Sequence, residues 1–542
     1  MSDLKQSNGI HRAHTWEIAL YALNNTSTNL YMSMVSYIAY FLAGIVGVTT
    51  VLAGSIITIM RIWDGVTDPF VGYLVDKTNT KFGKNRPYIV LGNVILFAMT
   101  WLMFNLLPSM NTKIRFPVFL LMYMVYIIGY TFQCVVTKSA QSCLTNDPKQ
   151  RPVFTMFDSV YNVLAMSLLV PLYVSGTLVP KYTLTSATNA SEIQALISQN
   201  PGIAASLTEK DGVTILSGFY HPEMFKELQL MLGSISAIFA VCAIIGLWRK
   251  DNVQYFGTGQ AVKVGFKDYI DVMAHNRAIQ MLVVSASSDK LSATMMTNAT
   301  IMVCLFGVIC GDYAMFGSNS AITTIPIALL TILGVGLIAR NMGQKKALVV
   351  GTWVSLISAA LMLGLFLFMD PTTMKLPLFS LTKPATFGNL FVPSNWSLFG
   401  VLFILLFCVM RSSAGIAGNI VIPMTADCAD YEVYRSGRYV PGLMGTLFSF
   451  VDKLISSFST TFVALLFAAI GYTDVLPTPQ SPYSTGIFVV TMFCFLGAPT
   501  IGWLCNIISM KFYPLTKEKM EEIQDRIAEI KAETMKETQS VK

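Results

Sequence analysis

Two aspartates in an otherwise apolar stretch are the residues of this sequence most suited to chemistry. Asp64 and Asp68 are four positions apart, so a helix places both carboxylates on one face, one turn from each other. Two such anions repel unless a cation lies between them or one takes up a proton. The Thr67 hydroxyl adds an oxygen ligand, and oxygen ligands suit a hard cation such as Na⁺. The pattern predicts a site for Na⁺ or a shared proton; in the alternative, one aspartate pairs with Arg61 and only holds helices together.

The helix that carries these aspartates is expected to lie in a lipid bilayer. The chain has 542 residues, of which 54% are hydrophobic and only 12% charged, with a mean hydropathy of +0.57. Soluble domains carry about 25% charged residues. Stretches that reach the length of a bilayer span include Tyr88–Leu107, Met231–Leu247, Ala347–Phe368 and Gly486–Ile508. Charges at the centre of a span cost about 2.5–3.5 kcal/mol, so we expect the buried aspartates to have a function.

The spans divide into two sets. We count about twelve, six on each side of a charged linker. The predicted divisions are an N-terminal half at 1–248 with an outer insertion at about 179–227, a cytoplasmic linker at 249–277, a C-terminal half at 278–513 and a cytoplasmic amphipathic tail at 514–542. A weak repeat after the second helix of each half supports this division, with Gly72–Arg86 matching Gly336–Lys346. Parallel six-helix repeats are typical of the major facilitator fold, whose substrate site lies at the midplane between the halves. The sequence therefore predicts an all-α membrane protein with this fold.

The basic residues of the loops predict the orientation. Most Lys and Arg residues fall in connections on one side of the predicted spans, and cytoplasmic loops carry such an excess. We therefore expect a multi-pass protein of the cell membrane with both termini in the cytoplasm. The net charge of +7 comes from these loops and does not indicate a nucleic-acid partner.

Motifs of enzymes and metal sites are missing from the sequence. It has no H-E-x-x-H, no G-x-S-x-G in a suitable context and no phosphate-binding glycine loop. Most of its nine cysteines lie in predicted spans and none form a C-x-x-C pair, so we interpret them as small apolar side chains. We expect no enzyme activity and no cofactor besides a coupling cation.

Four short motifs follow one another in the order of the predicted helices. They are Arg61-Ile-Trp-Asp64-x-x-x-Asp68-Pro69, Gly83-Lys84-x-Arg86-Pro87, Asp427-Cys-Ala-Asp430-Tyr431 and Phe512-Tyr-Pro-Leu-Thr516. With them the chain resembles, over nearly its whole length, the glycoside–pentoside–hexuronide:cation symporters of the major facilitator superfamily, which include the melibiose permease.

The resemblance implies a role for the second predicted span. Asp64, Thr67 and Asp68 would bind the coupling cation, together with Thr131 of the fourth span. Thr67 stands where the melibiose permease has asparagine, so Na⁺, Li⁺ and H⁺ all remain open as the coupling cation.

The resemblance also implies a substrate site and a gate. At or beside the family's substrate positions we expect Thr26, Cys134, Asp158 and Lys453 to contact substrate. The polar groups of Asn25, Gln133 and Ser449 suit sugar hydroxyls, and Lys138 either lines the same cavity or extends to the cytoplasmic interface. Thr26 and Cys134 stand where the melibiose permease has sugar-binding aspartates, so its way of holding a galactoside is not reproduced. Arg151 would form salt bridges with Asp427 and Asp430, a gate on the cytoplasmic face.

Taken together, these patterns predict a monomeric secondary transporter. It would couple Na⁺ or H⁺ to symport of a glycoside, pentoside or hexuronide by alternating access, with a small sugar and the lipid bilayer as its partners. The alternative is a carrier of the same fold for a non-sugar amphipathic solute, a lipid or a drug.

Overall fold

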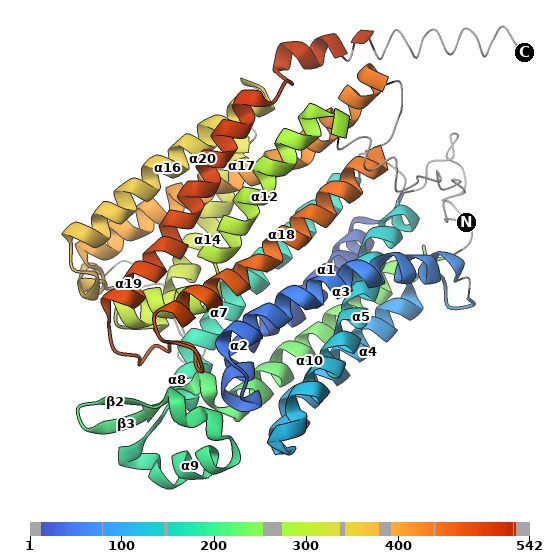
Figure 1. Ribbon diagram of the computed structural model, residues 1–542. Coiled ribbons are helices and arrows are strands. Elements are labelled where there is room, and N and C mark those ends of the chain that lie inside the picture. Colours follow the sequence, from blue (N-terminus) through green and yellow to red (C-terminus); the bar gives the residue numbers. More distant parts are fainter. Residues whose placement is uncertain are drawn as a thin grey trace, which may run out of the picture.

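The computed structural model describes residues 12–78, 80–145, 150–252, 274–335, 342–378, 392–436, 441–523 and 525–526. Long helices run side by side in one bundle, and a small sheet lies at one end (Figure 1). We call this the insertion end, and the opposite end, where α1 begins and α20 ends, the terminal end. Most of the predicted linker and residues 527–542 of the predicted tail lie outside the described residues.

In the first half of the chain, the long helices form from apolar stretches of the sequence. Its helices are α1 (Thr15–Val35), α2 (Ile38–Phe41), α3 (Thr50–Lys77), α4 (Arg86–Trp101), α5 (Thr112–Leu144), α6 (Arg151–Asn162), α7 (Val170–Tyr173), α8 (Val179–Tyr182) and α10 (Pro222–Leu247).

The second half has a similar order of long helices. They are α12 (Arg277–Met296), α13 (Ala299–Met302), α14 (Ala314–Gly334), α16 (Gln344–Phe368), α17 (Leu398–Ser436), α18 (Pro441–Ala469), α19 (Thr485–Met492) and α20 (Ala498–Phe512).

The apolar length of these helices confirms the predicted all-α membrane fold. Within the described residues, nine helical segments are long and apolar enough to cross a bilayer, or ten if the pair bent by 47° at α12 and α13 is one span. The 28-residue α3 is long enough, but its charged side chains lower its mean hydropathy. Of α18, residues Leu454–Ala469 form a shorter apolar helix. The number twelve and the boundaries of the halves therefore stay predictions.

The predicted insertion contains a small mixed unit. Three antiparallel strands, β1 (Leu184–Thr185), β2 (Thr208–Lys210) and β3 (Val213–Leu216), lie in the order β1-β3-β2, with α9 (Ser186–Gln199) between the first two in sequence. Figure 1 shows this unit at the insertion end, next to α8 and the start of α10.

A buried arginine connects this unit to the first half by hydrogen bonds. Arg115 is 3% exposed and donates to the backbone oxygens of Ile45 at 2.7 Å and Pro108 at 2.6 Å. It also donates to the side-chain oxygen of Asn200 at 2.6 Å and to the Gln199 carbonyl at 3.2 Å. One guanidinium thus joins the end of the first span, the connection before α5 and the end of α9. It can do so because its N–H donors point in fixed directions from a planar group.

The two halves contact each other along α3 and α18 and near α7 and α14. The Thr58 hydroxyl of α3 donates to the Ser457 carbonyl of α18 at 2.8 Å. The backbone N–H of Gly317 in α14 donates to the Ser175 hydroxyl at 3.0 Å. A side chain at Gly317 would collide with Ser175, so glycine permits this close approach.

The described part of the tail packs on the second half. Its helical residues 517–523 bury Ile523 completely, and Leu515 before them is 2% exposed. Both belong to an apolar cluster with residues of α12, α16, α17 and α20.

Replacing Arg115 by leucine is expected to lower the melting temperature of the purified protein strongly. The substitution leaves several buried oxygen acceptors unpaired, at about 1–3 kcal/mol each. Thermal unfolding in detergent, followed by tryptophan fluorescence, measures the effect. Lys113→Leu, two positions earlier and exposed, is the matched control and should unfold close to the wild type. Equal melting temperatures for the two variants would contradict this role of Arg115.

Candidate cation and substrate sites

Three of the four residues predicted to bind a cation lie together between α3 and α5. Asp64 is fully buried, and the Thr131 hydroxyl donates to its Oδ1 atom at 3.0 Å. The Thr67 hydroxyl lies 3.1 Å from that of Thr131 and donates to the Asp64 carbonyl at 3.0 Å. Asp68 follows one turn later on α3 and is half-buried. The helical spacing and the contact of α3 with α5 thus produce a buried cluster of oxygen atoms.

Arg61 of the same helix approaches this cluster from the other oxygen of Asp64. Its Nη1 atom lies 3.6 Å from Asp64 Oδ2, and its guanidinium lies over the Tyr130 ring at 5.7 Å. The ion pair considered in the sequence alternative is therefore present, and it balances the charge of Asp64. The Oδ1 atom accepts a hydrogen bond from the neutral Thr131 hydroxyl. This donor set of carboxylate and hydroxyl oxygens suits an alkali cation or a proton and does not suit a soft metal.

A second polar cluster joins α1 and α6. The Asn25 amide donates to both carboxylate oxygens of Asp158, at 2.9 and 3.1 Å. Asn162 donates to Asp158 Oδ1 at 2.8 Å, and Asn29 donates to Asn162 Oδ1 at 2.7 Å. The structure thus brings together Asn25 and Asp158, two of the predicted substrate residues. Asn162 was not predicted, although its spacing of four from Asp158 places it on the same helical face.

The other described substrate candidates do not join this cluster by hydrogen bonds. Gln133 is buried, and its amide donates to the Ile89 carbonyl of α4 at 2.6 Å, so it ties α5 to α4. Thr26 is fully buried in α1, whereas Cys134 is half-buried and Lys138 is exposed. Their contact with substrate stays a prediction. The side chains of Ser449 and Lys453 lie outside the described residues.

The predicted gate acids lie near the terminal end, on α17. Asp427 lines a cavity of about 450 Å³ between α17, the start of α16 and the tail, together with Lys345 and Lys517. Burial, and second the neighbouring charge of Asp430, raise the pKa of Asp427 to about 6. The side chain of Arg151 lies outside the described residues, so the gate itself stays a prediction.

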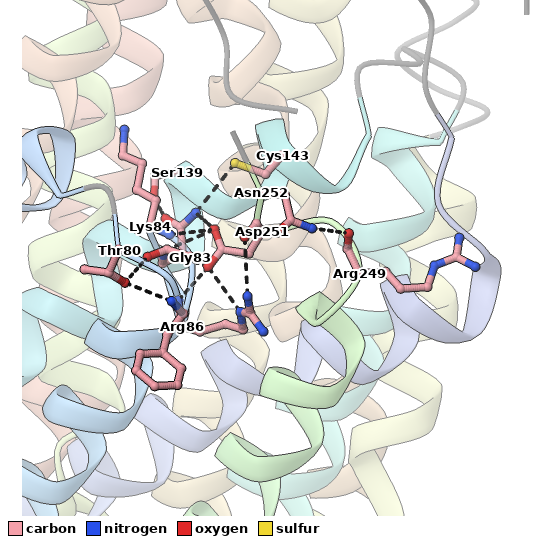
Figure 2. A network of polar contacts seen from close by, with 11 residues as sticks. Thr80, Gly83, Lys84, Arg86, Ser139, Cys143, Arg249, Asp251 and Asn252 are labelled. Carbon is pink, nitrogen blue, oxygen red and sulfur yellow. Dashed lines mark hydrogen bonds and ion pairs between the residues drawn. The ribbon is translucent and has the colours of Figure 1, made fainter. Parts of the chain in front are cut away.

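A carboxylate that sequence reasoning missed organises the terminal end of the first half (Figure 2). Asp251, fully buried after α10, accepts the backbone N–H groups of Asn85 and Arg86 at 2.9 Å each and that of Lys84 at 3.2 Å. It also accepts the Asn85 side-chain amide at 3.0 Å and lies 3.5 Å from Arg86 Nε. Gly83, with a φ of +96°, leaves room for this carboxylate, since any side chain there would collide with it. The motif Gly83-Lys84-x-Arg86 thus binds one carboxylate, that of Asp251.

Neighbours of Asp251 add further contacts at the same end. The Arg86 guanidinium lies over the Trp248 ring at 4.7 Å. Arg249 Nε lies 3.0 Å from Glu17 Oε1, at the start of α1. The end of α10 therefore connects α1 with the turn between α3 and α4. The motif with its arginine was visible in the sequence, but the acid that it binds lay in a stretch interpreted as linker.

These arrangements define the class of the protein. A bundle of long apolar helices that buries carboxylates and amides inside its spans is typical of a membrane transporter. A solved structure with the same fold is that of a bacterial homolog to the human lysosomal transporter Spinster; it has a TM-score of 0.56 and 12% identity, and the match covers 92% of this chain and 96% of that one.

The chain belongs to the MFS/sugar transport protein family, whose model matches residues 21–517. It is similar to the "Uncharacterized symporter YnaJ" of Bacillus subtilis, at 22% identity over 92% of this chain and 91% of the relative. It is also similar to the "Glucuronide carrier protein homolog" of Escherichia coli, at 22% identity over 93% of both chains. These matches confirm the predicted family and transporter class.

The substitution Asp251→Asn should destabilise the first half strongly. It removes the charge that faces Arg86 and turns an NH₂ group toward backbone N–H donors, and breaking a buried pair costs about 3–5 kcal/mol. We expect a lower melting temperature and faster amide hydrogen exchange at residues 83–86. The control is Asp474→Asn, which changes an exposed aspartate in the second half. If both variants exchange and unfold alike, Asp251 is not the organising group.

The raised pKa of Asp427 predicts that stability depends on pH. In the native state this carboxyl group keeps its proton up to about pH 6, whereas the ordinary pKa is 3.8. The native state thus binds more protons than the unfolded chain between about pH 4 and 6, so this contribution to stability falls as the pH rises through that window.

Melting temperatures from pH 4 to 7 test this dependence. Asp427→Asn should flatten the curve over the window. Asp430→Asn, which removes the second cause of the shift, should move the fall in stability to lower pH. A curve unchanged by Asp427→Asn would show that this carboxyl group does not titrate there.

Proposed function

We propose that the protein couples the movement of Na⁺ or H⁺ to the symport of a glycoside, pentoside or hexuronide. The halves would expose the substrate site to each side of the membrane in turn, with both termini in the cytoplasm. The buried oxygen cluster of Asp64, Thr67 and Thr131 carries this proposal. A charge is costly inside a span, so a carboxylate there that faces hydroxyls favours an exchangeable cation.

The charge balance around Asp64 fits a site that fills and empties. Arg61 lies 3.6 Å from one oxygen, beyond the short distance of a strong charge-assisted hydrogen bond. It offsets the aspartate charge when no cation is bound. A Na⁺ ion or a proton on the side of Oδ1 would add one positive charge, one helical turn from the half-buried Asp68. Two carboxylates on one helical face thus suit a site that takes up a cation or a proton, whereas a fixed helix contact needs only one pair.

The amide–carboxylate cluster of α1 and α6 supports a sugar as the substrate. Asn25, Asn29 and Asn162 offer amide donors and acceptors, and Asp158 offers a charged acceptor. Such groups match the hydroxyl pattern of a sugar, and all four are half-buried, which leaves them within reach of a solute. The relatives point the same way, since one is named a symporter and another a glucuronide carrier homolog.

Replacing Asp68 by alanine should abolish uphill accumulation of the sugar while downhill exchange continues, because coupling needs the cation site and exchange does not. The contrasting variant is Asp158→Asn, which should leave the accumulation ratio intact and raise the concentration for half-maximal uptake roughly tenfold, as expected for loss of a charged hydrogen-bond acceptor. Proteoliposomes with an imposed Na⁺ or pH gradient measure both quantities. Accumulation against a gradient by Asp68→Ala would refute the coupling role.

The substrate class is tested with labelled glycosides, pentosides and hexuronides, each with and without Na⁺ and a pH gradient. Uptake of one class that rises with one gradient supports the proposal and identifies the cation. No uptake of any sugar under any gradient, by protein that is folded in the same vesicles, would contradict a sugar substrate. It would favour a non-sugar amphipathic solute.

A further inference from the structure

The halves also meet at the insertion end, through a tyrosine of the insertion. The Tyr220 hydroxyl donates to the Leu476 carbonyl at 2.9 Å and accepts the Leu476 backbone N–H at 2.7 Å. Tyr220 is fully buried and Leu476 is 4% exposed, so water is excluded from this contact. Leu476 lies in the connection between α18 and α19, and Tyr220 precedes α10. One side chain therefore satisfies both backbone groups of a residue in the other half.

Aromatic side chains surround this contact. The Tyr40 hydroxyl of α2 donates to the Pro477 carbonyl at 2.9 Å. Phe219 stacks on Tyr40 with ring centroids 4.6 Å apart, and it meets Tyr313 of the second half edge-on at 5.5 Å. The patch joins the halves with few hydrogen bonds and much apolar contact, so it can separate without exposing a buried charge.

The insertion itself is held by the first half. Arg115 binds the end of α9, as described above. At the other edge, Glu227 of α10 accepts hydrogen bonds from Lys181 and Tyr182 of α8. Gly218 leaves no room for a side chain against the Val179 backbone. The unit is therefore fixed to one half and touches the other through Tyr220 and its aromatic neighbours.

We propose that Tyr220 is a positioning residue of the transport cycle: it latches the insertion to the second half and sets how strongly the insertion end is closed. When the halves part at this end, the two hydrogen bonds to Leu476 break, while the bonds of Arg115 within the first half persist. This inference rests on the alternate exposure of the site in the proposed function. It does not depend on which solute is carried.

The variant Tyr220→Phe isolates the latch, because it removes the hydroxyl and keeps the ring that fills the space beside Gly44. The matched control is Tyr182→Phe in the same unit, whose hydroxyl binds within the first half. Tyr40→Phe removes the second hydroxyl bond across the interface and tests the patch independently.

The readout is the distance between spin labels at two exposed positions, Ser198→Cys on α9 and Asp474→Cys in the second half, measured in lipid nanodiscs without substrate. Protein with its nine native cysteines alone gives the labelling background. We expect Tyr220→Phe to raise the ratio of long to short distances about tenfold, the effect of losing two modest hydrogen bonds. Tyr40→Phe should shift it in the same direction, and Tyr182→Phe should match the wild type.

Two results would overturn the latch. One is a distance distribution for Tyr220→Phe equal to that of the wild type; the other is an equal shift in Tyr220→Phe and Tyr182→Phe. The labels report the distance without substrate. A shifted distance distribution for Tyr220→Phe, together with no uptake of any tested sugar, would therefore contradict a sugar substrate and support the role of Tyr220. Sugar uptake with an unshifted distribution would keep the proposed function and refute the latch.

Discussion

A charge removed from water is stable only where protein groups replace its hydration, and the arrangement of this protein follows from how three buried charges meet that requirement. Arg115 is surrounded by carbonyl and amide oxygens, and Asp251 by backbone and side-chain N–H groups. Arg115 is satisfied by several segments at once, and Asp251 by the residues that lead into α4, so neither can be moved without breaking these contacts. They lie at opposite ends of the first half, Arg115 at the insertion end and Asp251 at the terminal end. Together they hold the helices of that half in a fixed arrangement at both ends.

Asp64 meets the same requirement in a different way. Its contacts include a neutral hydroxyl from Thr131 and a guanidinium at 3.6 Å, both of which tolerate a cation arriving beside the carboxylate. A buried charge that is fully paired by fixed donors favours rigidity, as at Asp251. A buried charge paired by adjustable neighbours suits a site that binds and releases, and coupling requires that the occupancy of this site changes the preference between two states of the halves.

The sequence predicted what depends on local spacing and on the solvent. Apolar length predicted the all-α membrane fold, the spacing of Asp64 and Asp68 predicted one helical face, and the motifs predicted the family. Contacts between distant elements were out of reach: nothing in the sequence indicates that Gln133 turns to α4 or that Asp158 collects Asn25 and Asn162. Asp251 was missed for the same reason, since its partners lie about 165 residues earlier in the chain.

Among the described residues, the hydroxyl contacts between the halves are of a different kind from the charged contacts within the first half. Thr58, Tyr40 and Tyr220 each cross the interface with a neutral hydroxyl bonded to a backbone group. Such bonds exchange readily for bonds to water and contribute about 0.5–1.5 kcal/mol each, whereas exposing an unpaired buried charge costs several. In the proposed cycle, relative movement of the halves would therefore break hydroxyl bonds and leave the contacts of Arg115 and Asp251 intact. The insertion adds two such bonds at a single end, both made by Tyr220, so in the proposed cycle it would change the balance between the two states without weakening either half.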